Sequence, residues 1–194
     1  EGAPVDVIVF TGSVAQIVRD LAALVGRSFL PPAWALGFHQ SRWSYKSART
    51  VLDVARRLRA LDLPADVIHL DIHYMDRYRV FTFSPERFRE PRQMHDALHA
   101  LGLRTLAIVD PGVSAVPYPV YETLKAGDML LERADGSPYV GMVWPGATVF
   151  PDFTLQRVRE AWGRFHAPLV AAGVAGFWND MNDPVFRAGK VYDP

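Results

Sequence analysis

The sequence predicts an α/β fold of repeated strand–helix units, and two patterns carry this prediction. Short, apolar, β-branched segments alternate with amphipathic segments from residue 34 onward, which is typical of a parallel sheet covered by helices. Each predicted strand of this series also ends in a polar residue, namely Gln40, Asp71, Asp110 or Asp180. Because the carboxyl ends of the strands carry the active site in such folds, these positions form the first candidate site.

The predicted elements follow in a regular order. Strands are expected over 5–10, 34–40, 65–71 and 104–110 and, after a long irregular segment, in the stretch AGVAGFWNDMNDP at 172–184. Helices are expected after Ser13 and Ser47, whose side chains suit N-caps, and over about 91–101 and 154–172, where apolar residues recur at helical spacing. The stretch ADGSPYV within the irregular segment predicts a hairpin turn.

The domain organisation follows from the number of strand–helix units. The prolines of FLPPAW break regular structure and indicate a boundary. No GxGxxG follows a strand, which disfavours a dinucleotide-binding sheet. A complete barrel needs about 250 residues, whereas only four units are present. The sequence therefore predicts the first half of a (β/α)8 TIM barrel over 31–194, preceded over 1–30 by the tail of another domain and a linker helix.

Composition excludes several classes of function. The formal net charge is zero, which argues against a nucleic-acid partner. The chain has no apolar run near the roughly 20 residues of a membrane-spanning helix, so no membrane partner is expected. The chain contains no cysteine, which excludes disulfides and thiolate metal sites. This also fits a reducing compartment and favours a cytoplasmic over a secreted protein, although the sequence does not fix the compartment.

Side-chain alternation places two residues of the last strand on one face. Trp178 and Asp180 point to the same side, and Phe177 points to the other. If the first side faces a barrel interior, Trp178 lines a cavity and Asp180 lies at its mouth. The alternative is that Asp180 only caps the following turn.

A second pattern leaves a metal site open. His69, Asp71 and His73 alternate along one predicted strand, and imidazole and carboxylate groups together bind divalent metals. The alternative is that these side chains bond to neighbours or to a substrate. The other histidines are expected to be surface or packing residues.

Aromatic residues near strand ends and loops suit a sugar, because the C–H faces of sugars stack on rings while acids bond to the hydroxyl groups. These residues are Trp34, Trp43, Tyr74, Trp144, Phe150 and Trp178. Some tryptophans are expected to belong to the core instead, Trp34 and Trp162 among them.

Five stretches of the chain, in order, resemble signature motifs of glycoside hydrolase family 31, the α-glucosidase type. They are PPAWALGFHQSRWSY, DVIHLDIHYMDRYRVFTF, LAIVDPGV, VWPGATVFPDFT and GFWNDMNDP. The resemblance implies a (β/α)8 barrel after a β-sandwich domain, and hydrolysis of α-linked sugars with retention of configuration. It implies no cofactor and no metal, and an α-glucoside or α-linked oligosaccharide as the substrate.

The resemblance also implies roles for individual residues. Asp180 matches the catalytic nucleophile of the family. The positions that match sugar-binding residues, or stand beside them, are Asp71, His73, Asp110, Trp144, Trp178 and Met181. Two positions depart from the motifs: His73 stands where many members have Asp, and Asp183 stands at a Glu position. Asp183 therefore presents its carboxylate one methylene closer to the backbone.

A retaining glycosidase needs a second carboxyl group, about 5–5.5 Å from the nucleophile, to protonate the leaving group. The resemblance places this acid/base beyond residue 194, so the chain alone is expected to be inactive, and its expected partner is the rest of the barrel. The unpaired strand edges of half a barrel also favour association into a homo-oligomer. Two alternatives stay open: a carbohydrate-binding homologue without turnover, and a metal-dependent hydrolase that uses His69, Asp71 and His73.

Overall fold

The computed structural model describes residues 6–182 of the 194-residue chain, in two compact units. The first ends at Leu36 and contains helix α1, Val14–Val25, and the short 3-10 helix η1, Ala33–Leu36. The Ser13 side chain accepts a hydrogen bond from the Gln16 amide, and the Gln16 side chain accepts one from the Ser13 amide, so α1 begins as the sequence predicts. Residues 6–10 form no strand, so that prediction is wrong over its described part. That residues 1–30 end a preceding domain stays a prediction.

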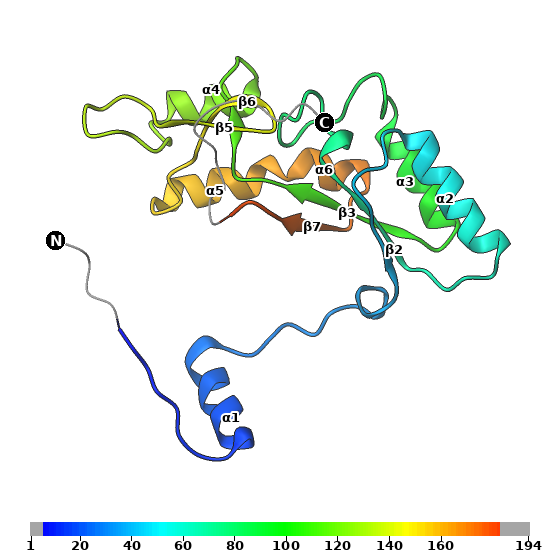
Figure 1. The fold of residues 1–194 in the computed structure, drawn as a ribbon, viewed down its shortest axis with the longest axis horizontal. Coiled ribbons are helices and arrows are strands. Elements are labelled where there is room, and N and C mark those ends of the chain that lie inside the picture. The colour runs from blue at the N-terminus through cyan, green and yellow to red at the C-terminus, as the bar shows by residue number, and fades with distance from the viewer. Residues whose placement is uncertain (1–5, 183–194) are drawn as a thin grey trace. The chain divides into compact units, whose positions relative to one another are not determined.

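The second unit begins at Gly37 and is built on a parallel sheet (Figure 1). Its strands are β1, His39–Gln40; β2, Val67–Leu70; β3, Arg104–Val109; and β7, Gly176–Asn179. They pair in the order β1-β2-β3-β7, all parallel, which is the strand order of a barrel built unit by unit. The strand expected over 34–40 is much shorter, because residues 33–36 form η1 instead.

Helices cover one face of this sheet. They are α2, Ala48–Ala60; α3, Pro91–Ala100; α5, Gln156–Phe165; and α6, Ala167–Ala172. The buried strand residues Ile68, Leu70 and Ala107 belong to the core on this side. The helix expected over 154–172 is divided at His166, because Pro168 in the first turn of α6 has no amide hydrogen to donate to a continuous helix.

The segment between β3 and α5 is ordered rather than irregular, which corrects the prediction. It contains α4, Pro119–Ala126, and a small antiparallel sheet in the order β4-β6-β5. Its strands are β4, Val113–Ser114; β5, Val140–Val143; and β6, Gly146–Val149. The predicted turn before β5 forms, because the Asp135 carboxylate accepts hydrogen bonds from the Ser137 amide and hydroxyl. Figure 1 shows α4 and this sheet grouped together.

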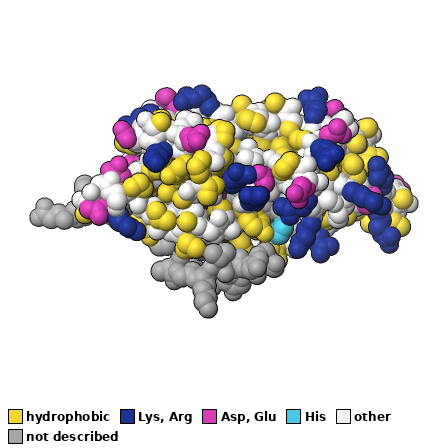
Figure 2. Space-filling model, turned by 90° about the horizontal axis from the view of Figure 1, so that it is seen from above, with side chains coloured by type: hydrophobic (Ala, Val, Ile, Leu, Met, Phe, Trp, Pro, Cys, Tyr) yellow, Lys and Arg dark blue, Asp and Glu magenta, His cyan; other side chains and the backbone are white. Residues whose placement is uncertain are grey.

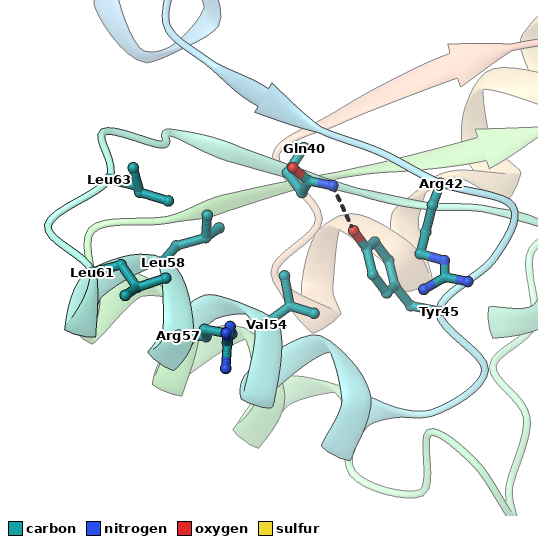
Figure 3. Close-up of a pocket in the computed structure, with 8 residues that line it drawn as sticks. All are labelled: Gln40, Arg42, Tyr45, Val54, Arg57, Leu58, Leu61 and Leu63. Carbon is teal, nitrogen blue, oxygen red and sulfur yellow. Dashed lines mark hydrogen bonds between the residues drawn. The ribbon is translucent and has the colours of Figure 1, made fainter.

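The surface carries charge and apolar groups in different places. On the face in Figure 2, Lys and Arg side chains gather over the end that bears α2 and α3, and hydrophobic side chains gather nearer to α4 and the small sheet. An apolar groove lies between α2 and the edge strand β1, where Tyr45 accepts a hydrogen bond from Gln40 at 3.1 Å (Figure 3). Among the described helices, none combines the length and the apolar character needed to cross a membrane.

Candidate active site

Three carboxylates stand at neighbouring strand ends of the parallel sheet. Asp71 directly follows β2, Asp110 follows β3 and Asp180 follows β7. The register pairs Val109 of β3 with Asn179 of β7, so Asp110 and Asp180 leave adjacent strands at the same level. The three acidic strand ends predicted from the sequence therefore converge at one edge of the sheet. Gln40 does not join them, because its side chain bonds to Tyr45 in the groove beside α2.

Burial controls the charge of this cluster. Asp110 is only 4% exposed, and its Oδ1 has no hydrogen-bond partner among the described residues. Burial, and then the nearby Asp180 and Asp71, raise the pKa of Asp110 to about 7. A carboxyl group with this pKa exchanges its proton near neutrality, so the cluster can lower its own negative charge beside Asp180.

Asp71 is held more firmly than Asp110. Its Oδ1 accepts a hydrogen bond from the Ile72 amide at 2.7 Å, because Asp71 caps the short 3-10 helix η2, Ile72–Tyr74. Burial raises the pKa of Asp71; the Ile72 hydrogen bond opposes that shift, and the charge of Asp180 adds to it. Both neighbours of Asp180 therefore carry raised pKa values.

The last strand separates its side chains as alternation predicts. The Trp178 ring lies on the inner face of the sheet, 5.9 Å from the ring of His69 on β2. The Phe177 ring lies on the helix-covered face, 4.5 Å from the ring of His166 between α5 and α6. Asp180 has the parity of Trp178, so it leaves the strand on the inner side.

Aromatic side chains form a wall near the carboxylates. Trp43 lies 6.3 Å from the ring of Trp144 and 6.3 Å from the ring of His73, and His73 in turn lies 5.6 Å from Tyr78. Trp43 comes from the loop after β1 and Trp144 from the turn between β5 and β6. Two residues that are distant in sequence thus meet as one surface, with Trp43 58% exposed.

Two aromatic residues expected at this surface belong to the core instead. Tyr74 is fully buried and donates a hydrogen bond to the Ile108 carbonyl at 2.9 Å. Phe150 is also buried. Tyr78 was not predicted, and only its position five residues after His73 in an aromatic-rich stretch signals it.

The structure does not form the metal site that the alternating His69, Asp71 and His73 suggest. Strand β2 ends at Leu70, and His73 lies in η2, so the three side chains do not continue one strand face. His69 contacts His39 and Trp178, whereas His73 contacts Trp43 and Tyr78. Within residues 6–182, no group of three or more His, Asp or Glu side chains is arranged to hold a metal ion.

The residues after Asp180 are described only in part. Met181 is half-buried and has a φ of 59°, an uncommon conformation for a residue other than glycine that is often found at functional sites. Asn182 is exposed. Asp183, where the motif departs from the family pattern, lies outside the described residues.

The profile of the glycosyl hydrolases family 31 TIM-barrel domain matches residues 28–194. This chain belongs to glycoside hydrolase family 31. A relative, α-glucosidase 2 of Bacillus thermoamyloliquefaciens, is 44% identical over 100% of this chain and 25% of its own length. Human neutral α-glucosidase AB is 39% identical over 96% of this chain and 20% of its own length. The chain thus spans about a quarter or less of these family 31 relatives.

Solved structures of family 31 members share the fold. A Tris-bound glucosidase II α subunit aligns with a TM-score of 0.83 at 34% identity, over 88% of this chain and 19% of that chain. A family 31 α-glucosidase from Bacteroides thetaiotaomicron aligns with a TM-score of 0.79 at 39% identity, over 90% of this chain and 30% of that chain. The predicted fold class is confirmed: the parallel sheet is part of a family 31 TIM barrel.

Proposed function

We propose that this chain supplies the nucleophile-bearing part of a retaining α-glucosidase, and that the full-length protein containing it hydrolyses terminal α-linked glucosides. The observation that carries the proposal is the convergence of Asp71, Asp110 and Asp180 at three neighbouring strand ends. The similarity to proteins named α-glucosidase supports the choice of substrate.

Asp180 is the proposed nucleophile. Its carboxylate oxygen attacks the anomeric carbon while an acid protonates the departing oxygen, and water then hydrolyses the glycosyl–enzyme with the same acid acting as base. The position of Asp180 after Trp178, on the inner side of the sheet, gives the carboxylate an aromatic neighbour beside the sugar.

The two neighbouring carboxyl groups are proposed to hold sugar hydroxyl groups. Asp110, with a pKa of about 7, can donate or accept a hydrogen bond near neutral pH. Asp71 is fixed by the Ile72 amide and keeps its second oxygen for a hydroxyl group. His73, Trp144, Trp178 and Met181 are proposed to complete the pocket around the ring.

The acid/base is proposed to lie in a part of the barrel beyond residue 194, so that residues 1–194 alone do not turn over substrate. The described strands support this, since β1 and β7 each pair on one side only and the sheet is open. The partner of this chain is then the rest of its own barrel.

The experiment compares the full-length protein with its Asp180→Asn variant on an aryl α-glucoside. We expect the rate to fall by about three orders of magnitude or more, because the variant lacks the attacking carboxylate, while circular dichroism shows an unchanged fold. Asp152→Asn, distant in sequence and near the start of α5, is the matched control and should retain the rate. Equal rates in Asp180→Asn and the parent protein would refute Asp180 as the nucleophile. If residues 1–194 alone hydrolysed the substrate at the rate of the full-length protein, the proposal that this part is inactive by itself would be refuted.

A further inference from the structure

Two histidines contact each other on the inner face of the sheet, before the strand ends that carry the carboxylates. The Nδ1 of His39 on β1 lies 3.1 Å from the Nε2 of His69 on β2, and the two ring centroids are 5.3 Å apart. A hydrogen bond between two imidazole nitrogens requires one nitrogen to carry a hydrogen and the other to be bare. The pair can therefore keep this contact only while at least one of the two rings is neutral.

The pair is joined to the wall beside Asp180. The His69 ring lies 5.9 Å from the Trp178 ring, tilted by 63°, so the edge of one ring meets the other. In the register, His69 stands opposite Leu106, and Leu106 opposite Gly176. A Cβ at position 176 would lie 2.5 Å from Leu106 Cδ2, so the Leu106 side chain fills the space that Gly176 leaves.

The surroundings of His69 favour its neutral form. Burial, and then the charge that His39 can carry, lower the pKa of His69. The other charged groups of the same sheet face are Arg104 at the start of β3 and the three carboxylates at the strand ends. In the tautomer of neutral His69 that leaves Nε2 bare, His39 donates to it from Nδ1.

We propose that His39 and His69 are a positioning pair for Trp178: the hydrogen bond from His39 fixes the His69 ring, and His69 holds the indole that stands two residues before Asp180. The pair itself follows from the geometry alone, whereas its effect on turnover rests on the proposed function.

The test replaces His39 in the full-length protein with residues that keep or lose the donor. His39→Asn places an amide nitrogen at about the position of Nδ1 and retains the bond to His69. His39→Leu has a similar volume and no donor, and His39→Gln moves the amide nitrogen away from that position, which gives a second loss variant if His39→Leu does not fold. His99→Leu, on the exposed side of α3, is the control.

The first readout is tryptophan fluorescence between pH 8 and pH 5. A protonated imidazole quenches a contacting indole more strongly than a neutral one, so quenching reports protonation of His69 against Trp178. Without the donor, neutral His69 loses a stabilising hydrogen bond, so protonation becomes easier. The pH midpoint of the fluorescence quenching should therefore rise by roughly one pH unit in His39→Leu and His39→Gln, but by less in His39→Asn. Other tryptophans also have histidine neighbours, so a control must isolate Trp178. The difference between the His39 variants should vanish when Trp178→Phe is added, because the indole that reports on His69 is then absent.

The second readout is the split between kcat and KM on the aryl α-glucoside. We expect kcat to fall roughly tenfold in the loss variants with KM changed less than about threefold, and His39→Asn and His99→Leu to stay near the parent. Identical fluorescence titrations in His39→Leu and His39→Asn would overturn the proposal that His39 and His69 position Trp178. A difference between these variants that persists with Trp178→Phe would overturn it as well. A titration as expected with unchanged kcat would overturn its role in turnover, and absence of activity in the parent protein would count against the proposed function alone.

Discussion

Asp110 and Asp180 leave two paired strands at the same level, and the charge of Asp180 raises the cost of charge on Asp110. Val109 and Asn179 are register partners, and the pKa of Asp110 reaches about 7, with burial as the main cause and Asp180 as the next. In the unfolded chain an aspartate has a pKa near 3.9. The folded protein therefore binds a proton at Asp110 more tightly than the unfolded chain does.

This difference predicts a pH-dependent gain in stability for Asp110→Asn. Because the folded-state pKa is raised, ionised Asp110 destabilises the fold above its unfolded pKa, with a cost that grows from about pH 4 and levels off above pH 7. Asp110→Asn should then raise the free energy of unfolding by on the order of 4 kcal/mol at pH 8 and little at pH 4. Urea denaturation of the full-length protein at both values measures it. A gain of equal size at the two pH values would show that the charge is not the cause.

The contact between Trp43 and Trp144 predicts a binding role for the turn between β5 and β6. Trp144→Ala should raise KM for an aryl α-glucoside roughly tenfold, since a lost stacking contact is worth ~1.4 kcal/mol, and should change kcat less. Phe153→Ala, an aromatic residue packed on Trp162, is the matched control and should leave KM unchanged. Steady-state kinetics checks both variants, and a KM effect as large in Phe153→Ala would point to a general loss of packing.

Gly173 predicts a large stability effect at the turn into β7. It ends α6 with a φ of 108°, and a Cβ there would lie 2.6 Å from the Cβ of His95 on α3. Gly173→Ala should cost about 2 kcal/mol or more, from the left-handed conformation and the clash together. Gly163→Ala within α5 meets no atom within 4 Å and should instead stabilise by about 0.5–1 kcal/mol. Chemical denaturation measures both, and a loss in Gly163→Ala similar to that in Gly173→Ala would contradict this account.

The open sheet predicts self-association of the isolated chain. Among the described strands, β1 pairs only with β2 and β7 pairs only with β3, so each presents an unpaired edge. Residues 1–194 should elute as dimers or larger species in size-exclusion chromatography with light scattering, and become monomeric when covalently joined to the rest of the barrel. A monodisperse monomer with a sharp cooperative melting transition would contradict this prediction.

The main strand–helix units could be predicted from the sequence because local and tertiary preferences agree there. Strand β3 ends in four consecutive apolar residues, 106–109, and the Ser47 side chain at the start of α2 accepts a hydrogen bond from the Thr50 amide. Phe177 and Trp178 fall on opposite faces for the same reason, since alternation depends only on an extended backbone.

Other features could not be read from the sequence because they depend on contacts between distant segments. The span 34–40 is apolar enough for a strand, yet β1 retains only His39–Gln40, where β2 offers hydrogen-bond partners. In the sequence, His73 continues the alternation of His69 and Asp71, but in the structure Asp71 caps η2 and the strand ends before His73. His39 was expected at the surface or in packing, and only the pairing of β1 with β2 brings it to His69.

The most direct test of the central claim is covalent trapping of the nucleophile. The full-length protein is incubated with a fluorinated α-glucosyl substrate that forms the glycosyl–enzyme faster than water can hydrolyse it, and digested peptides are analysed by mass spectrometry. The account predicts one glycosyl label, on Asp180, and none in Asp180→Asn. A label on Asp71 or Asp110, or sugar binding with no label at all, would contradict Asp180 as the nucleophile, and the second result would favour a carbohydrate-binding homologue without turnover.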